Sequence, residues 1–437
     1  MKIVTLTILL LLIHQTAFAA VKYKIERTYD FVLKIPILVK HKSMHKKQTM
    51  ILVHGLGANG SKSWDASSDE FAKHYHVVAL DLPGFGQSLG TFGVPVSIES
   101  YSGLIMRIVS AYAKSKVVFV GHSMGAAIGL RFISQNSHLV DKAILIDAAG
   151  ILQKAAYVKF LTRIPQKEKP NDTHPAKTSG ISALNTFTDV LVEIIDRHSS
   201  IESIKSLLKE NVDAQIAINL IETDFSSDLR NIRTKTLLIW GEDDPVAPVR
   251  TGKMLDFHLK KSKLIVLPNA GHTPHIKTPT EVATIIHQWL RSPKIDEFQF
   301  QKSADLNFNC KNKALNKIIS GAFGSLTFNS CSNVQLKNVS ARSIQLNNTV
   351  ASLENVKIVS RQTGLTANES SVMTTNLVID ASVGIHTNGS KLDLAGTIIN
   401  YKTHPISGSG SLIYWSTSFQ SKNGQPTKTI HRKQILP

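Results

Sequence analysis

Cysteine is nearly absent from this chain. Its 437 residues include only Cys310 and Cys331, and neither has the neighbouring Cys or His residues that metal-ligand spacing requires. We expect no metal and no cofactor. In an exported protein the two cysteines are candidates for one disulfide, with a pair of buried free thiols as the alternative.

Long hydrophobic runs are also scarce, and the one clear example lies at the N-terminus. Lys2 is followed by an apolar run over residues 3–13 and then by Ala17-Phe18-Ala19. A positive start, a short apolar core and an Ala-x-Ala cleavage site are typical of a secretory signal peptide, and the run is short for a membrane span. We therefore expect residues 1–19 to be a signal peptide, cut near Ala19, and the protein to be secreted or periplasmic.

Acidic residues are outnumbered. The chain has 32 Asp and Glu residues against 50 Lys and Arg residues, which gives a formal net charge of +18. Its hydrophobic content of 42% excludes general disorder. A basic protein favours anionic surfaces. Because no nucleic-acid motif accompanies the charge, an anionic membrane or an acidic polysaccharide is the favoured partner, and charge that serves solubility alone is the alternative.

Residues 20–292 alternate between strand-like apolar runs and helical patterns, which is typical of an α/β fold with a mainly parallel sheet. A stretch from about 150 to 228 breaks this rhythm with a Pro-containing loop and helical patterns, and it predicts a helical cap inserted between two strands. The predicted strands cover 48–53, 76–80, 117–120, 143–146, 236–240 and 262–267.

The amino-acid composition changes after a predicted linker at 293–299. From 300 to 437 Asn, Ser and Thr dominate, and strand-like segments recur about every 21 residues, which predicts a parallel β-helix-like solenoid with one repeat per coil. An antiparallel β-sandwich is the alternative. Cys310 and Cys331 share the spacing and would stack on successive coils. The repeating series are Asn312, Asn333, Asn355 and Asn376; Leu315, Leu336, Ile358 and Ile379; and Ile344, Leu365, Ile385 and Ile406.

Gly121-His122-Ser123-Met124-Gly125 lies between a predicted strand and a predicted helix. A serine between two glycines at such a turn is typical of a nucleophile elbow, although the pattern alone also fits a turn with a helix-capping serine. Acyl transfer needs two donors for the developing oxyanion, and the backbone N–H groups of Leu56 and Met124 are the candidates. His54 and His122 each adjoin a candidate donor or nucleophile, so we expect packing or turn hydrogen bonds for both.

A serine nucleophile needs a base and an acid that orients the base. In a fold of this type they should follow the serine in the order acid, then histidine. Glu242, Asp243 and Asp244 follow one late strand, and His272 follows the last strand. Both segments are predicted to lie at the carboxyl edge of the sheet, where such folds place their sites.

Residues 48–292 resemble the α/β-hydrolase superfamily, in its cap-bearing branch of esterases, lipases and C–C hydrolases. The resemblance rests on the order of five motifs: His54-Gly55, Asp81-x-Pro83-Gly84-x-Gly86-x-Ser88, Gly121-x-Ser123-x-Gly125, Gly241-x-x-Asp244 and Gly271-His272. It implies that Asp244 is the acid, with Asp243 as runner-up, and that His272 is the base, with His275 as a distant alternative. It says nothing about residues 300–437.

The resulting functional hypothesis is a secreted serine hydrolase that cleaves small acyl esters or lipids through Ser123, Asp244 and His272. Apolar residues between 151 and 161 of the predicted cap are candidates for an acyl pocket. One alternative keeps the triad and changes the bond to a C–C, amide or thioester bond. Another is a non-catalytic protein that binds surfaces through its basic C-terminal domain.

Overall fold

The computed structural model describes residues 22–57, 59–88, 97–151, 212–295, 299–415, 417–422, 428–430 and 433–436. The predicted signal peptide and most of the predicted cap, including residues 152–161, lie outside the described residues. Within the described ranges, no helix combines the length and the apolar character needed to cross a bilayer.

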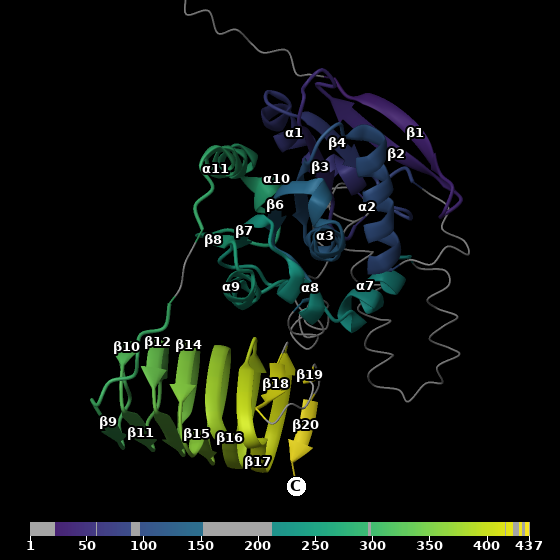
Figure 1. Cartoon of the computed structure of the whole chain (residues 1–437). Coiled ribbons are helices and arrows are strands. Elements are labelled where there is room, and N and C mark those ends of the chain that lie inside the picture. Colours follow the sequence, from purple (N-terminus) through teal and green to yellow (C-terminus); the bar gives the residue numbers. More distant parts are fainter. Residues whose placement is uncertain are drawn as a thin grey trace, which may run out of the picture.

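The first part of the chain forms an eight-stranded sheet in the order β1-β2-β4-β3-β5-β6-β7-β8 (Figure 1). The six strands from β3 to β8 run parallel to one another, as the sequence predicts. β1 and β2 pair antiparallel at one margin and were not predicted, because β1 is rich in charged residues and β2 contains a proline, Pro36. The strands are β1 (Lys24–Asp30), β2 (Ile35–Lys42), β3 (Thr49–Val53), β4 (His76–Leu80), β5 (Val117–His122), β6 (Val140–Ile146), β7 (Lys235–Gly241) and β8 (Ser262–Leu267).

Helices cover both faces of this sheet, which explains why its central strands are apolar throughout. In β3, Ile51 and Val53 belong to the core shared with α2, α3, α8 and α9, whereas Met50 and Leu52 belong to the core shared with α1 and α11. The helices are α1 (Asp65–Ala72), α2 (Ile98–Tyr112), α3 (Met124–Gln135), α7 (Val212–Glu222), α8 (Ser226–Asn231), α9 (Val249–His258), α10 (Pro274–Lys277) and α11 (Pro279–Arg291), with 3-10 turns η1 (Gly60–Trp64) and η2 (Ser137–Leu139).

The second part forms a twelve-stranded sheet that curls into stacked coils, a β-helix-like domain (Figure 1). Its strands pair in parallel from β9 to β18, which excludes the antiparallel sandwich, and β19 and β20 pair antiparallel at the last coils. The strands are β9 (Phe308–Lys311), β10 (Ile319–Ala322), β11 (Ser325–Asn329), β12 (Val334–Ala341), β13 (Ser343–Asn347), β14 (Val350–Val359), β15 (Thr363–Asn368), β16 (Ser371–Ala395), β17 (Ile398–Trp415), β18 (Thr417–Ser421), β19 (Lys428–Ile430) and β20 (Lys433–Leu436).

The predicted 21-residue spacing holds in the later coils but is wrong in the first ones. Ile344, Leu365, Ile385 and Ile406 are in register on successive strands, as predicted. Leu336, however, pairs with Leu353, 17 residues on, instead of with Ile358. The cause is the length of the corners, because Ala341 and Ile344 are three residues apart whereas their partners, Ile358 and Leu365, are seven residues apart.

The two cysteines show the same shift. Cys310 is in register with Phe328, so Cys331 does not stack directly on it and lies three residues further along its coil. A disulfide nevertheless joins Cys310 and Cys331. The offset of three residues leaves the Cα atoms 6.5 Å apart, within the range that a disulfide spans.

Asparagines stack at the corners of the coils, although along a different series from the predicted one. Asn376 Nδ2 donates to Asn355 Oδ1 at 2.9 Å, and Asn355 Nδ2 donates to Asn338 Oδ1 at 3.1 Å, so Asn338 takes the place predicted for Asn333. All three have φ between 53° and 60°. Asparagine tolerates this left-handed conformation, and its amide satisfies its neighbour in the ladder.

Helix α9 joins the two parts. Arg250 forms an ion pair with Asp393 at 3.1 Å and hydrogen-bonds Thr375 Oγ1 at 2.9 Å, and Lys253 pairs with Glu354 at 2.7 Å. Because α9 begins only five residues after Asp244, the second domain packs against the helix that follows the predicted acid loop.

Candidate active site

Ser123 occupies a strained turn between β5 and α3. Its φ of 51° and ψ of −117° lie outside the conformations that non-glycine residues favour. The flanking glycines allow the chain to approach itself closely. A Cβ at Gly121 would lie 2.5 Å from the carbonyl oxygen of Gly125, and one at Gly125 would lie 2.3 Å from the carbonyl oxygen of Val53. The turn therefore holds the serine at the carboxyl edge of the sheet.

The structure brings together the three residues that the sequence singles out. His272 Nε2 lies 2.8 Å from Ser123 Oγ, and His272 Nδ1 lies 2.8 Å from Asp244 Oδ2. Ser123 and Asp244 are buried, whereas the His272 side chain retains 18% exposure. This geometry allows His272 to accept the serine proton while the carboxylate fixes its tautomer.

Asp244, and not Asp243, faces the histidine. Its second oxygen, Oδ1, accepts hydrogen bonds from the backbone N–H groups of Val246 and Ala247 at 2.7 and 2.9 Å. The tight turn after β7 thus fixes Oδ1 and leaves Oδ2 facing His272. Asp243 is exposed on the same turn.

Asp147, at the end of β6, is a site residue that the sequence analysis missed. It is fully buried, and its Oδ1 accepts the backbone N–H of Gly241 at 2.9 Å. Burial raises the pKa of Asp147 to about 9, and the adjacent Asp244 carboxylate adds to this rise. Because Asp147 Oδ2 is buried without a hydrogen-bond partner, nothing compensates a charge there, and the raised pKa leaves this carboxyl group protonated at neutral pH. Its place directly after a predicted strand was the available signal.

The other histidines near the serine are buried. His54 makes the turn hydrogen bonds that the sequence predicts. Its Nδ1–H donates to the carbonyl oxygen of Gly55 at 2.6 Å, and its Nε2 accepts the backbone N–H of Leu82 at 3.0 Å. His275 contacts Trp64 and His122, with ring centroids 4.6 and 4.2 Å apart. Burial lowers the pKa of His275 to about 3, so it is neutral at physiological pH. Its ring nitrogens have no hydrogen-bond partner, so it does not contact the serine through them.

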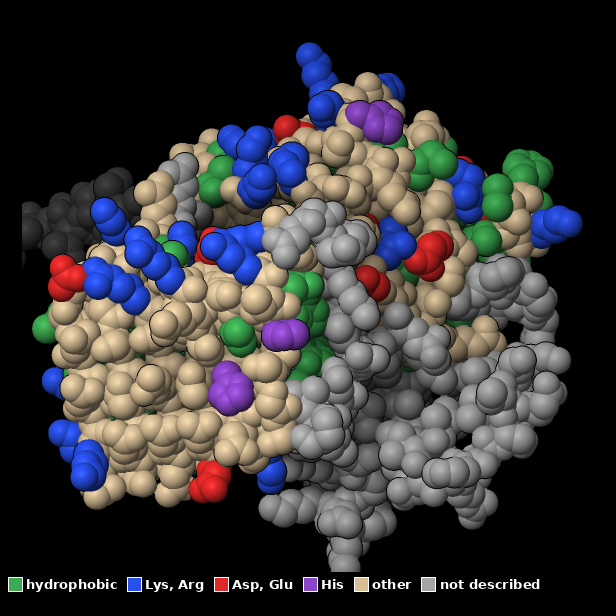
Figure 2. All heavy atoms as spheres, turned by 60° about the horizontal axis from the view of Figure 1, so that its bottom comes forward, with side chains coloured by type: hydrophobic (Ala, Val, Ile, Leu, Met, Phe, Trp, Pro, Cys, Tyr) green, Lys and Arg blue, Asp and Glu red, His purple; other side chains and the backbone are tan. Residues whose placement is uncertain are grey.

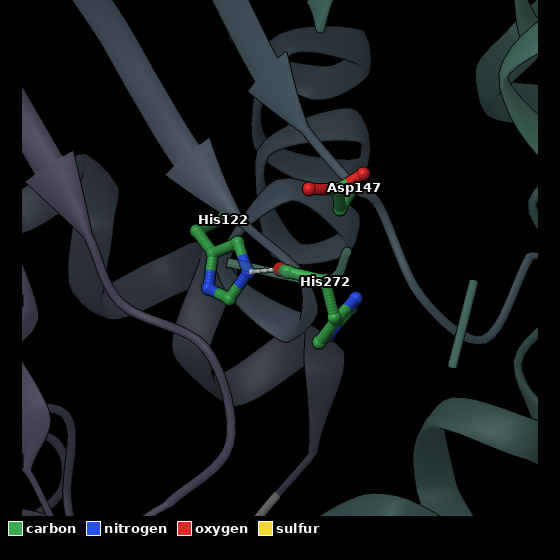
Figure 3. A group of neighbouring side chains, drawn as sticks. All are labelled: His122, Asp147 and His272. Carbon is green, nitrogen blue, oxygen red and sulfur yellow. Dashed lines mark hydrogen bonds between the residues drawn. The ribbon is translucent and has the colours of Figure 1, made fainter. Parts of the chain in front are cut away.

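Among the described residues, one group of three side chains brings together atoms of the kinds that bind metal ions. His122, Asp147 and His272 each offer an atom within 4.8 Å of the others (Figure 3). His122 Nε2 already bonds the carbonyl oxygen of His272 at 2.7 Å, and both ring nitrogens of His272 face the serine and Asp244. A metal at this place would therefore compete with the Ser123–His272–Asp244 contacts.

The predicted oxyanion donors flank the serine. Met124 is the first residue of α3, where a backbone N–H has no acceptor within the helix and points outward from its N-terminus. Leu56 is half-buried in the turn after β3, which lies beside β5 in the sheet. Both residues lie at the same carboxyl edge of the sheet as Ser123.

Comparison with known proteins identifies the family of this fold. A family model described as the alpha/beta hydrolase fold matches residues 48–279, more than half of the chain. The chain belongs to the α/β hydrolase family, which includes esterases, lipases and C–C hydrolases, and it is a hydrolase of that family.

Individual relatives are distant. The chain is 26% identical over 252 residues to 2-hydroxy-6-oxo-2,4-heptadienoate hydrolase of Pseudomonas putida, covering 55% of this chain and 88% of the relative. It is also 26% identical to the uncharacterized hydrolase YugF of Bacillus subtilis, over 59% of this chain and 95% of YugF. Among solved structures, a thermophilic esterase from Thermogutta terrifontis is 22% identical with a TM-score of 0.44, covering 62% of this chain and 98% of the esterase.

Proposed function

We propose that this hydrolase cleaves carboxylic esters of small acyl chains or lipids, with Ser123 as nucleophile. The observation that carries the proposal is the continuous chain of contacts from Ser123 Oγ through His272 to Asp244, at 2.8 Å on each side. Family membership supports a hydrolase, and the ester bond is the finer step that we propose.

In the proposed reaction, Ser123 Oγ attacks the ester carbonyl while His272 Nε2 takes the hydroxyl proton. The N–H groups of Leu56 and Met124 hold the oxyanion that forms. As the tetrahedral intermediate collapses, the C–O bond breaks and His272 gives its proton to the departing alcohol. Water, deprotonated by His272, then releases the acid and restores the serine. Asp244 stabilises the imidazolium in both halves.

An ester panel graded by acyl length, run on the wild type and on Ser123→Ala, tests the proposal. We expect the variant to lose at least about a thousandfold in turnover, because the nucleophile is removed. Ser102→Ala, which changes a buried serine of α2, is the matched control and should turn over as the wild type does. Labelling by a fluorophosphonate should follow turnover. A folded wild-type protein that resists the label and hydrolyses no ester would contradict the proposal.

Cleavage of a C–C bond is the second candidate, because one relative is by name a 2-hydroxy-6-oxo-2,4-heptadienoate hydrolase. The same triad serves both reactions. Supplying that relative's dienoate alongside the esters separates the candidates. Turnover of the dienoate that exceeds turnover of every ester would replace the ester assignment.

We also propose that the protein is exported, secreted or periplasmic. The leader-like pattern at 1–19 and the disulfide of the second domain support this, because disulfides persist in oxidising compartments. Mass spectrometry of the N-terminus from a culture that expresses the chain tests it, and we expect the mature protein to begin near Ala20. An intact Met1 terminus in the cytoplasm would contradict export.

The predicted binding of anionic membranes or acidic polysaccharide by the C-terminal domain stays a prediction. Lys and Arg side chains lie scattered over the face in Figure 2, across both parts of the molecule. The basic surplus alone therefore does not single out the C-terminal domain as the binding surface.

A further inference from the structure

The turn between β1 and β2 exposes apolar side chains to an unusual degree. Phe31 is 83% and Val32 66% exposed, and Ile25 and Tyr29 on β1 are 59% and 49% exposed. Alternate residues of a strand share a face, so Ile25 and Tyr29 form one stripe that continues into Phe31, whose ring meets Tyr29 edge-on at 5.2 Å. Four large apolar side chains thus lie within eight residues, on the edge strand β1 and the turn that follows it.

The charged side chains around this stripe are mostly cationic. Lys24, Arg27 and Lys34 are exposed on the same hairpin. Its acids are engaged elsewhere: Asp30 is buried and pairs with Arg107 at 2.6 Å, and the half-buried Glu26 accepts the hydroxyl of Tyr112 at 3.0 Å. The exposed surface of the hairpin is therefore both apolar and positively charged.

The hairpin reaches past the sheet on the side of the active site. β2 runs antiparallel to β4, and Val39 pairs with Leu80, the last residue of β4. The four residues of β2 that precede Val39 therefore extend beyond the carboxyl end of β4, by roughly 13 Å at the rise of a strand. Ser123 follows β5 at this same carboxyl edge. In Figure 1, β1 and β2 lie at the margin of the first sheet.

We propose that this hairpin docks the enzyme on an anionic phospholipid bilayer, with Phe31 and Val32 inserted at the interface and the cations bound to lipid phosphates. Aromatic and aliphatic side chains beside Lys and Arg suit the boundary between headgroups and acyl chains. The patch is a narrow projection, which suits a fluid lipid interface better than the broad complementary surface of a stable protein complex. Docking of this kind holds the edge that carries Ser123 toward the membrane.

Vesicle sedimentation with the purified chain tests the proposal, using phosphatidylcholine vesicles with and without phosphatidylglycerol. We expect the wild type to bind the vesicles that contain phosphatidylglycerol, and the double variant Phe31→Ser/Val32→Ser to bind them at least roughly tenfold more weakly. The control is Val350→Ser, which alters a side chain of similar exposure, 60%, on the second domain. It should bind as the wild type does. All variants share one N-terminus, so the leader cannot produce a difference between them.

A charge variant tests the second part of the proposal. Lys24→Glu/Lys34→Glu should weaken binding to vesicles with phosphatidylglycerol roughly tenfold or more and leave the residual binding to phosphatidylcholine unchanged. Wild-type protein that ignores anionic vesicles, or an apolar double variant that binds them as tightly as the wild type, would overturn the proposal. The second result would instead place membrane binding on another surface, such as the C-terminal domain.

Binding and catalysis are separable in these assays. Ser123→Ala should bind vesicles as the wild type does, and Phe31→Ser/Val32→Ser should hydrolyse a water-soluble ester at the wild-type rate, because neither exposed residue touches the triad. The soluble-ester rate also verifies that the double variant is folded. Docking therefore stands or fails independently of the proposed ester hydrolysis.

Discussion

Asp147 links the stability of the first domain to pH in a direction that can be measured. Its pKa rises from 3.8 in the unfolded chain to about 9 in the fold, because the carboxyl group is buried beside Asp244. Between these two values the folded protein holds a proton that the unfolded chain releases. Unfolding therefore releases a proton, and stability falls as the pH rises through this window.

The substitution Asp147→Asn removes this dependence. Asparagine cannot ionise, yet its oxygen can accept the N–H of Gly241 and its amide can donate to Asp244. One pH unit corresponds to about 1.4 kcal/mol per proton, so from pH 6 to pH 8 the wild type should lose about 3 kcal/mol relative to the variant. Both pH values lie inside the window, so the slope depends little on where the upper pKa falls.

Urea unfolding of both proteins at several pH values, followed by tryptophan fluorescence, measures this difference. A difference in unfolding free energy that stays constant from pH 6 to 8 would show that Asp147 is ionised in the fold, and the reasoning would be wrong. Activity supplies a second measurement. Asp147→Asn should keep the wild-type kcat at pH 7, whereas Asp147→Ala, which leaves the buried N–H of Gly241 without a partner, should lower kcat roughly tenfold.

Two further predictions concern the second domain and its contact with the first. Cys310→Ser should destabilise the β-helix-like domain by about 3 kcal/mol in denaturant unfolding, because the disulfide closes a loop of about 21 residues, and a reductant should reproduce the loss in the wild type but add nothing in the variant. Arg250→Ala should speed proteolytic cleavage between the two domains severalfold, because it removes the partly buried ion pair with Asp393. The control is Arg291→Ala, which changes an exposed arginine of α11. Equal cleavage of both variants would show that α9 does not hold the domains together.

Much of the site was predictable because its chemistry is encoded locally. Ser123 lies between two glycines after an apolar strand, and only glycines fit where the turn brings Gly125 within contact of Val53. The predicted oxyanion donors follow from the same local argument, because Leu56 lies in the turn after β3 and Met124 directly follows Ser123. His272 and the acid turn could be placed because parallel strands deliver their loops to one edge of a sheet.

The sequence did not predict features that depend on contacts between residues far apart in the chain. Asp147 follows a strand as many aspartates do, and its role depends on its burial against Asp244. The β1–β2 hairpin was missed because β1 has many charged and few apolar residues, and because Pro36 interrupts the apolar run of β2. The coil register went wrong where short corner turns shifted Leu336 onto Leu353, because the repeat in the sequence averages over turns of unequal length.

The sequence by itself therefore determined the class of fold, the proposed nucleophile and the order of its partners, because glycine spacing and strand periodicity are local properties of the chain. Only the tertiary structure decided which aspartate faces His272, that Asp147 keeps a proton beside it, and that an apolar, cationic hairpin projects from the edge that carries Ser123. These three depend on burial and on distances between residues remote in the chain. Desolvation and charge–charge interactions are set by that packing, and no local pattern encodes them.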